Sequence, residues 1–232
     1  MKSQQIDIIS NENKRFIPDF PLKLKGIDFE TLEKDENSIY GLSKEMKFIY
    51  FNPGFIQFSR SNDIEGNLIN NLPLGIPVSK ILAGEKISEF YIQNFKRIIA
   101  TGEIWHHEYE CSSADEFRIY RQTTYPLKDG EILIIINKLI VVQPIESTGR
   151  ETNDADPKRY VQSSGFITQC GNCRHIQRTD QSEIWDWVPA WAEKIPEGTS
   201  HSICPICFDY YWKYGRIKFT PNSSDDFTDK TK

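Results

Sequence analysis

Residues 48–55 read F-I-Y-F-N-P-G-F, and this stretch marks the passage from a strand to a helix. Asn52 is a strong helix N-cap, because its side-chain oxygen can accept a hydrogen bond from a free backbone N–H of the first turn. Pro53 suits the first helical position, where its missing N–H has no partner to lose. The sequence therefore predicts a strand over Lys47–Phe51 and a helical turn from Pro53 to Phe58.

The chain upstream of this stretch predicts a hairpin and a short helix. Ser38–Leu42 precedes S-K-E-M, a four-residue connection that suits a hairpin with Lys47–Phe51. Asp28 can cap a helix over Phe29–Lys34, with Leu32 facing inward. Residues 1–28 are polar and mixed, and we interpret them as a loosely attached arm.

The chain downstream predicts one long helix and three more strands. Residues 61–84 are rich in Asn, Gly and Pro and predict loops with short helical turns. An amphipathic helix follows, with apolar residues at helical spacing, and Gly102 ends it. Those apolar residues are Ile87, Phe90, Tyr91, Phe95, Ile98 and Ile99. The predicted strands are Ile104–Cys111, Phe117–Leu127 and Ile132–Val142, the last two joined by K-D-G.

These elements predict an α+β fold, a five-stranded antiparallel sheet with helices on one face. The order β-β-α-α-β-β-β, with F-I-Y-F-N-P-G-F after the first hairpin, resembles a PAS domain over residues 29–142. Residues 105–127, W-H-H-E-Y-E-C-S-S-A-D-E-F-R-I-Y-R-Q-T-T-Y-P-L, look like the last three strands of PAS sensors in bacterial signalling proteins. The resemblance implies a small pocket between the sheet and the helix 87–100, without naming its ligand.

Four of the five cysteines form two pairs, C-G-N-C at 170–173 and C-P-I-C at 204–207, with 30 residues between the pairs. Two thiolates three positions apart can hold one side of a metal ion, and two such pairs complete a tetrahedral site. Such a site suits Zn(II). Cys170, Cys173, Cys204 and Cys207 are therefore candidate metal ligands. Four thiolates also suit a rubredoxin-like iron or an iron–sulfur cluster, so zinc is favoured and iron stays open.

The region around the pairs predicts a small metal-stabilised module. Residues 143–160 read as a polar linker, residues 161–218 hold both pairs, and residues 219–232 read as a disordered tail. A segment of 58 residues has a marginal hydrophobic core, and structural zinc can supply about 10 kcal/mol or more of folding energy. We interpret four tryptophans as an aromatic shell on the site: Trp185, Trp187, Trp191 and Trp212.

A second resemblance covers this module. C-G-N-C-R-H-I-Q, then W-D-W-V-P, then S-H-S-I-C-P-I-C-F-D-Y-Y look like a cysteine-rich, zinc-ribbon-like segment found after PAS domains in bacterial sensors. That segment usually carries glycine where this chain has Ser202. Both resemblances together imply a role in signal transduction, and neither identifies the stimulus.

Other cofactor motifs lack their structural context. G-N-C-R-H-I-Q resembles the flavin-adduct motif of light-oxygen-voltage domains, but Cys173 follows all five predicted strands. That position argues against flavin, and the absence of a C-x-x-C-H motif argues against haem, so we expect neither cofactor. His106 and His107 adjoin on a strand and must point to opposite faces. His175 and His201 are expected to support the site or lie at the surface, and Cys111 to pack as a small apolar residue rather than as a reactive thiol.

Composition restricts the function further. The net charge of −5 disfavours binding to a phosphate backbone, so no nucleic-acid partner is expected, and Arg118, Arg121 and Lys128 read as a solvated strand face. No apolar run approaches the ~20 residues of a membrane span. The N-terminus has no signal-peptide core, which predicts a cytoplasmic protein. The sequence contains neither a P-loop nor a nucleophile elbow, so neither motif indicates an enzyme.

The sequence thus predicts a non-enzymatic cytosolic sensor or adaptor with a structural zinc module. Its output would require a partner, such as a histidine kinase, and a homodimer is expected from the way PAS domains pair. The alternative is a thiol-based redox or metal-responsive switch that uses the same four cysteines. An enzyme with an unrecognised site has no positive support in the sequence.

Overall fold

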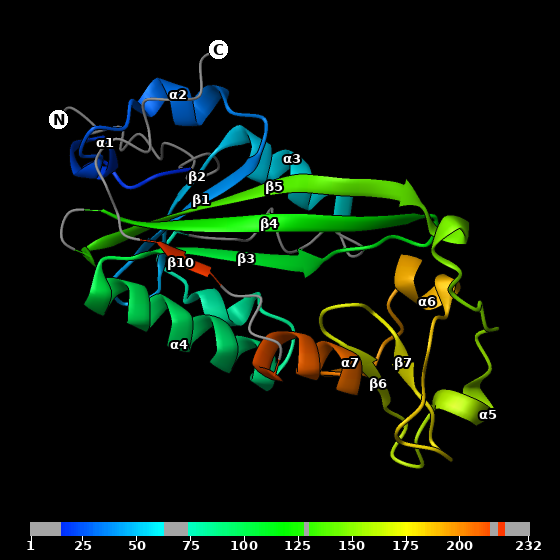
Figure 1. Cartoon of the computed structure of the whole chain (residues 1–232). Helices are drawn as coiled ribbons and strands as arrows, with labels where there is room; N and C mark the ends of the chain where they lie inside the picture. Colours follow the sequence, from blue (N-terminus) through cyan, green and yellow to red (C-terminus); the bar gives the residue numbers. More distant parts are fainter. Residues whose placement is uncertain (1–14, 63–73, 128–129, 214–217, 221–232) are drawn as a thin grey trace, which may run out of the picture.

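The computed structural model describes residues 15–62, 74–127, 130–213 and 218–220. The chain is mixed α+β, and its larger sheet has the strand order β10-β3-β4-β5-β1-β2 (Figure 1). These strands are β1 (Ser38–Ser43), β2 (Phe48–Phe51), β3 (Ile104–Glu110), β4 (Glu116–Leu127), β5 (Ile132–Pro144) and β10 (Lys218–Thr220). Every pairing in this sheet is antiparallel. The five predicted strands and their antiparallel arrangement are confirmed, and β10 joins the edge beside β3.

Capping residues stand at three predicted helix boundaries, whereas the helix after Asn52 continues to Asn62, past its predicted end at Phe58. The helices of this region are α1 (Phe20–Lys23), α2 (Phe29–Lys34), α3 (Pro53–Asn62) and α4 (Glu85–Thr101). The Asp28 carboxylate accepts the Thr31 N–H at the start of α2. The Asn52 side-chain oxygen accepts the Phe55 N–H at 2.7 Å. Gly102 adopts the left-handed conformation, with φ of 72°, that ends α4.

The sheet has a hydrophobic core on each face. On β5, Leu133 and Ile135 pack with Phe95 of α4, while Ile132 and Ile134 pack on the opposite face. Side chains alternate along a strand, so one strand serves both cores. α1 and α2 lie on this opposite face (Figure 1) and contribute Phe20 and Leu32 to its core. The prediction that all helices cover one face is therefore wrong, because the N-terminal helices cover the other.

The N-terminal segment is part of this second core. Phe20 is fully buried, and its ring stacks on Tyr50 at 4.4 Å between centroids. Arg15 forms an ion pair with Glu33 at 2.6 Å, and its guanidinium also donates to the Phe51 carbonyl at 3.0 Å. Residues 15–28 are therefore packed rather than loosely attached. Residues 1–14 lie outside the described part of the chain.

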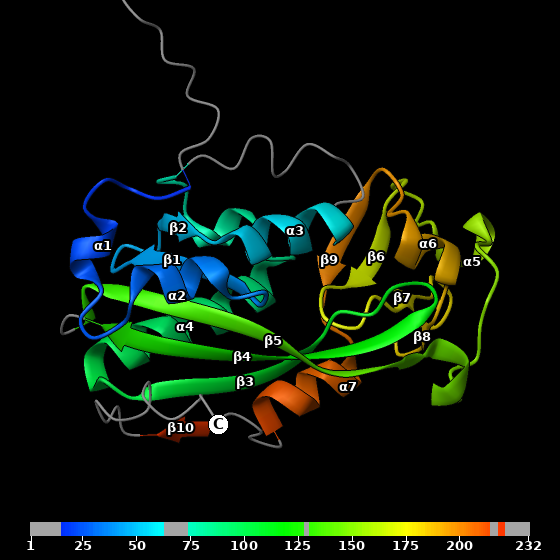
Figure 2. The same ribbon diagram turned by 90° about the horizontal axis from the view of Figure 1, so that it is seen from above.

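A second, smaller sheet carries the cysteine pairs, with the strand order β8-β7-β6-β9 (Figure 2). Its strands are β6 (Ile167–Cys170), β7 (Ile176–Gln177), β8 (Trp185–Asp186) and β9 (Thr199–Ser202). The short helices α5 (Pro157–Tyr160), α6 (Pro189–Glu193) and α7 (Pro205–Phe208) accompany it, and a π-helical turn, η4 (Asp209–Lys213), follows α7. We name the described residues 15–148 with β10 the sheet unit, and residues 157–213 the cysteine unit.

The two units are more closely joined than a linker predicts. Gln143 and Pro144, assigned above to the linker, belong to β5, and a 3-10 turn (Ile145–Thr148) follows directly. Phe219 and Thr220, assigned to the tail, lie in β10 and pair with β3. Residues 221–232 lie outside the described residues, as do Lys128 and Asp129 of the predicted K-D-G turn and residues 63–73 of the predicted loops. Within the described ranges, no helix combines the length and apolar character of a membrane span.

Candidate metal centre

The first cysteine pair lies in a tight turn between β6 and β7. Cys170 ends β6, and its N–H donates to the His175 carbonyl at 2.8 Å. The Arg174 N–H donates back to the Cys170 carbonyl at 3.0 Å, and Arg174 has a φ of 62°. This left-handed residue lets the chain reverse immediately after Cys173. The turn therefore directs both sulfurs of the pair to one side.

The second pair lies at the start of α7. Cys204 is the N-cap residue of α7, and Pro205 occupies the first helical turn. The Cys207 N–H donates to the Cys204 sulfur at 3.4 Å, in place of the oxygen of an ordinary capping side chain. β6 and β9 run parallel, with Cys170 opposite Ser202, and the Gly171 N–H donates to the Ser202 carbonyl at 2.8 Å. This pairing brings the two cysteine turns together.

The structure places all four predicted ligands in one cluster. Their sulfur atoms lie within 4.8 Å of one another, and the Cys173 and Cys204 sulfurs are 3.7 Å apart. Each of the four residues is buried, with exposed fractions between 0% and 6%. All four are free thiols, because a disulfide needs two sulfurs about 2 Å apart. Cys111 is also free and stands outside the cluster.

The spacing suits a tetrahedral metal ion. A zinc–sulfur bond of about 2.3 Å implies sulfurs about 3.8 Å apart at the corners of a tetrahedron, close to the 3.7 Å of Cys173 and Cys204. Backbone N–H groups also point at the sulfurs, for example from Cys204 to Cys170 at 3.4 Å. Such donors stabilise thiolates, the form that binds metal. The four cysteines could therefore hold a metal ion such as zinc.

Without a cation, the four buried cysteines cannot all ionise. Hydrogen bonds from Cys173, Cys204 and Cys207 lower the pKa of the Cys170 thiol. Hydrogen bonding to Cys170 and burial raise the pKa of both Cys173 and Cys207. Four negative charges cannot share a buried space of this size without a compensating ion. A divalent cation removes this conflict, because it binds all four groups as thiolates.

The predicted tryptophan shell is mostly wrong. Only Trp185, together with Ile203, packs against the four cysteines among the described hydrophobic residues. Trp187 packs with Ile145 and Ala192, and Trp191 packs with Tyr160. Trp212 is 39% exposed. Trp191 thus joins a core of the cysteine unit, Trp187 joins a core shared with Ile145 of the sheet unit, and Trp212 lies partly at the surface.

The two nearby histidines are not in the cluster. The His175 ring contacts the Cys173 carbonyl at 3.3 Å and lies 5.6 Å from the Trp187 ring. His201 lies on β9 opposite Gln169. Burial lowers the pKa of both imidazoles, which favours their neutral forms. Both histidines thus border the site without supplying a ligand to the four-cysteine cluster.

Two residues that the sequence analysis did not select contact the site. The Asn172 amide nitrogen donates to the Cys207 sulfur at 3.1 Å. Its amide oxygen accepts the Glu110 N–H at 3.3 Å and the Tyr211 hydroxyl in a short hydrogen bond. Asn172 lies between the first two cysteines, and Tyr211 lies four positions after Cys207. Proximity to the cysteine motifs is the signal that could have identified both residues.

The interior side of β3 faces α4, where the PAS resemblance implies a pocket. Aromatic rings fill this space: His107 lies 5.1 Å from Phe90 and 5.5 Å from Trp105 between ring centroids. Burial lowers the pKa of His107 to about 3, so its ring is neutral. Among the residues that the structure describes, the Nε2 atom of His107 and the Nε1 atom of Trp105 find no hydrogen-bond partner. His106 and His107 do point to opposite faces, since the His106 ring lies beside Thr123.

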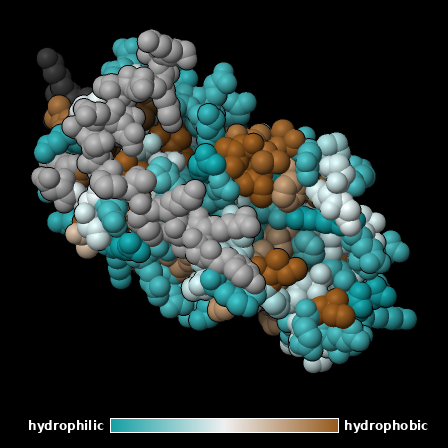
Figure 3. All heavy atoms as spheres, in the orientation of Figure 1, coloured by the Kyte–Doolittle hydropathy of each residue, from teal (hydrophilic) through white to brown (hydrophobic). Residues whose placement is uncertain are grey.

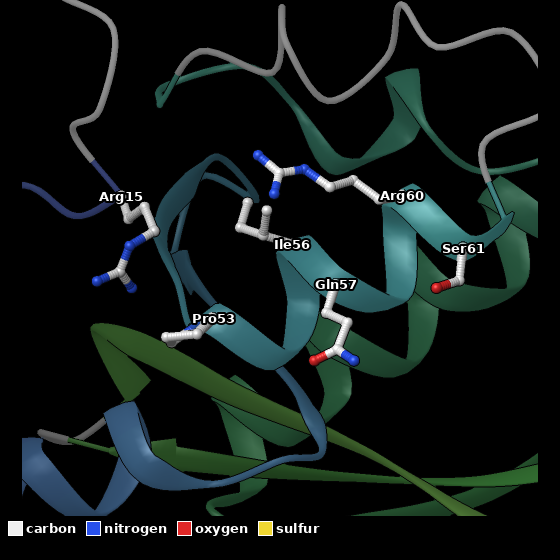
Figure 4. A pocket seen from close by; sticks show the side chains of 6 residues that line it. All are labelled: Arg15, Pro53, Ile56, Gln57, Arg60 and Ser61. Atoms are coloured by element: carbon white, nitrogen blue, oxygen red, sulfur yellow. The ribbon is translucent and has the colours of Figure 1, made fainter.

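The described surface pockets lie elsewhere. A pocket of about 550 Å³ opens beside α3, with Arg15 and Arg60 on its rim (Figure 4). The other residues that line it are Pro53, Ile56, Gln57 and Ser61. A pocket of about 230 Å³ lies near Lys23 and Glu131. Neither lies between the sheet and α4.

The cysteine turns pack directly on the start of α4. A Cβ added to Gly171 would lie 2.5 Å from the Ala83 carbonyl oxygen, and one added to Gly84 would lie 2.8 Å from the His201 carbonyl oxygen. Gly84 also has a φ of 88° and precedes the first residue of α4. Two glycines therefore allow backbone to approach backbone where the units meet.

Comparisons with known proteins add little to this geometry. No protein-family model and no curated protein matches the chain. Among solved structures, the crystal structure of the phage VqmA–DPO complex is similar over 52% of this chain and 52% of that chain. The sequence identity is 15% and the TM-score is 0.33. The chain thus spans about half the length of that protein, and this TM-score does not establish a shared fold.

Proposed function

We propose that the four cysteines hold a structural zinc ion. The observation that carries this proposal is the cluster of four buried sulfurs within 4.8 Å of one another. Cys170, Cys173, Cys204 and Cys207 would each supply one thiolate. The bound ion would offset part of the buried negative charge and connect the two cysteine turns, which lie on opposite ends of a 30-residue insert.

We further propose that the chain is a non-enzymatic sensory or regulatory protein of bacterial signal transduction, located in the cytoplasm. The sheet unit would act as a PAS-like sensor that binds a small ligand or a partner. Support comes from the predicted strand order and from the sequence resemblance. A second copy of the chain and a separate signalling protein, such as a histidine kinase, are the proposed partners.

One surface is available for such partners. The half of β5 that α1 and α2 leave uncovered exposes Leu139, Val141 and Val142, at 38% to 54% (Figure 3). Exposed apolar side chains that follow one another along a strand favour an interface, here on both faces of the sheet because Val141 and Val142 point to opposite faces. This observation supports a partner without distinguishing a second copy from another protein.

The first test is elemental analysis of freshly purified full-length protein for zinc and iron. We expect one zinc per chain. One iron per chain would keep the site and change its chemistry, so the redox-switch alternative would then be preferred. Absence of both metals, together with four thiols that react readily, would contradict the proposed metal site.

Burial of the cysteines supports a structural ion over a redox switch. Oxidants reach thiolates that are exposed, and these four residues are at most 6% exposed. We therefore expect mild peroxide to leave the metal bound. Prompt release of zinc by peroxide, measured with a chromogenic zinc indicator, would favour the switch.

A further inference from the structure

Tyr211 lies in the cysteine unit but packs in the core of the sheet unit. It lies in η4, directly after the second cysteine pair, yet it is 3% exposed and belongs to the hydrophobic core between the sheet and α4. Its ring lies 4.9 Å from the Phe90 ring of α4 and 4.9 Å from the His107 ring of β3. A side chain of the cysteine unit therefore occupies the interior of the sheet unit.

The hydroxyl of Tyr211 is connected to the metal ligands through one residue. It donates to the Asn172 amide oxygen, and the amide nitrogen of Asn172 donates to the Cys207 sulfur at 3.1 Å. The Glu110 N–H donates to the same amide oxygen at 3.3 Å. The Glu110 N–H fixes the orientation of the amide, because a backbone N–H can only donate and a flipped amide would set its NH₂ against it. The nitrogen must then face the sulfur.

The strength of this connection depends on the metal. A metal-bound Cys207 is a thiolate, and a hydrogen bond to an ionised acceptor is about twice as strong as a neutral one. A thiol is only a weak acceptor. Loss of the ion therefore weakens the hydrogen bond from Asn172 to Cys207. Because Asn172 is then less firmly placed, the hydrogen bond from the Tyr211 hydroxyl to Asn172 weakens as well.

We infer that Asn172 and Tyr211 couple occupancy of the four-cysteine site to the packing of the core between β3 and α4. The inference rests on the proposed metal site and states how metal binding there would be regulated. Coupling of this kind is reciprocal: whatever displaces the Tyr211 ring from Phe90 and His107 weakens metal binding by the same factor. A ligand that enters this core would therefore act on the metal centre, and the metal would act on the ligand.

Two matched pairs of variants of the full chain test the coupling through zinc affinity, measured by competition with a chromogenic chelator. Tyr211→Phe keeps the ring and removes the hydroxyl; its control, Tyr160→Phe, removes a buried hydroxyl that donates to Asp186 at 2.7 Å within the cysteine unit. Phe90→Leu loosens the ring contact with Tyr211. Its control, Phe95→Leu, alters the same helix at a ring that contacts Tyr91 and Trp105.

We expect Tyr211→Phe and Phe90→Leu each to weaken zinc binding about fivefold or more, the lower end of coupling between protein sites. Both controls should bind zinc as the unaltered chain does. Equal weakening in a variant and its control would mean general destabilisation and would overturn the coupling. Unchanged affinity in Tyr211→Phe and Phe90→Leu would overturn it as well.

Hydrogen exchange gives a readout that does not depend on affinity. With zinc bound, peptides from residues 86–110 should exchange faster in Tyr211→Phe than in Tyr160→Phe. Chelation of zinc should produce the same acceleration in the unaltered chain. If zinc binds but residues 86–110 do not respond to its removal, the coupling fails while the proposed site stands. If the chain binds no zinc, both fail.

Discussion

The two units differ in what holds them together. The sheet unit buries two large apolar cores, one on each face of its sheet. The cysteine unit has one apolar cluster of four buried residues and shares a second, of three, with Ile145 of the sheet unit; its remaining buried cluster consists of the four cysteines. Apolar area is the main source of stability where it is plentiful. Where it is scarce, a metal can replace it. Loss of a metal ligand should therefore unfold the cysteine unit alone, whereas loss of a buried ring should destabilise the sheet unit whether or not zinc is bound.

The strongest test of this contrast is loss of one ligand. Cys204→Ser should abolish ordered structure in residues 157–213, because the ion contributes about 10 kcal/mol or more of apparent folding energy. Limited proteolysis and hydrogen exchange should detect the loss, while β4 and β5 stay protected. Cys111→Ser is the matched control, since Cys111 lies outside the cluster. Unchanged protease resistance after residue 160 in Cys204→Ser would contradict the contrast.

The second test damages the apolar unit. Phe20→Ala removes a fully buried ring that stacks on Tyr50. The loss should lower the free energy of unfolding of the sheet unit by about 3–5 kcal/mol, measured by urea denaturation of zinc-loaded and zinc-free protein alike. Leu22→Ala, in the same short helix but 87% exposed, should change it by no more than about 0.5 kcal/mol. Equal effects of the two variants would mean that the N-terminal segment is not packed.

The contrast also explains what the sequence could predict. Asn52 before Pro53, Gly102 after the long helix and the two cysteine pairs are local patterns, and the structure has the helix boundaries and the cluster that they indicate. Capping and ligand spacing depend on residues a few positions apart, so they can be recognised without the fold.

Contacts between distant segments could not be predicted in the same way. Phe20 stacks on Tyr50, and Tyr211 inserts beside Phe90. Nothing in the local pattern of a polar N-terminal segment or a short aromatic run identifies such a partner. For the same reason the sequence predicts four tryptophans around the metal site, whereas the structure places Trp185, Trp187 and Trp191 in three separate clusters and leaves Trp212 39% exposed. An aromatic residue predicts burial but not the core that it joins.

The third test acts where the two units meet. Gly84→Ala would place a Cβ 2.8 Å from the His201 carbonyl oxygen, at a φ of 88°. Gly75→Ala is its matched control, because Gly75 has a φ of 92° with no atom within 4 Å of the added Cβ. Both glycines have a positive φ, so the comparison reduces the contribution of backbone strain to the difference. We expect Gly84→Ala to be less stable than Gly75→Ala by about 1–3 kcal/mol, measured by thermal unfolding. Equal stability of the two variants would mean that the units make no close contact at Gly84.

The smallest effects concern a polar arrangement that occurs once in each unit, a carboxylate that accepts hydrogen bonds from an arginine and a tyrosine. In the sheet unit, Glu33 accepts hydrogen bonds from Arg15 and Tyr50; in the cysteine unit, Asp186 accepts them from Arg178 and Tyr160. Burial opposes ionisation of each carboxyl group, but these hydrogen bonds lower both pKa values overall.

A lowered folded-state pKa gives stability that is complete above the unfolded value, about 4.3 for Glu and 3.9 for Asp, and that is lost as the pH falls through the folded value. Glu33→Gln should therefore lower the free energy of unfolding of the sheet unit by about 1 kcal/mol at pH 7 and should not change it in strong acid.

Asp186→Asn should not change the pH at which the cysteine unit unfolds, because protonation of the thiolates releases the metal first. Urea denaturation of the sheet unit and hydrogen exchange of the cysteine unit, from pH 3 to 7, measure both. A larger effect at Asp186 would mean that polar contacts rather than the ion dominate the cysteine unit, and the contrast between the units would then be false.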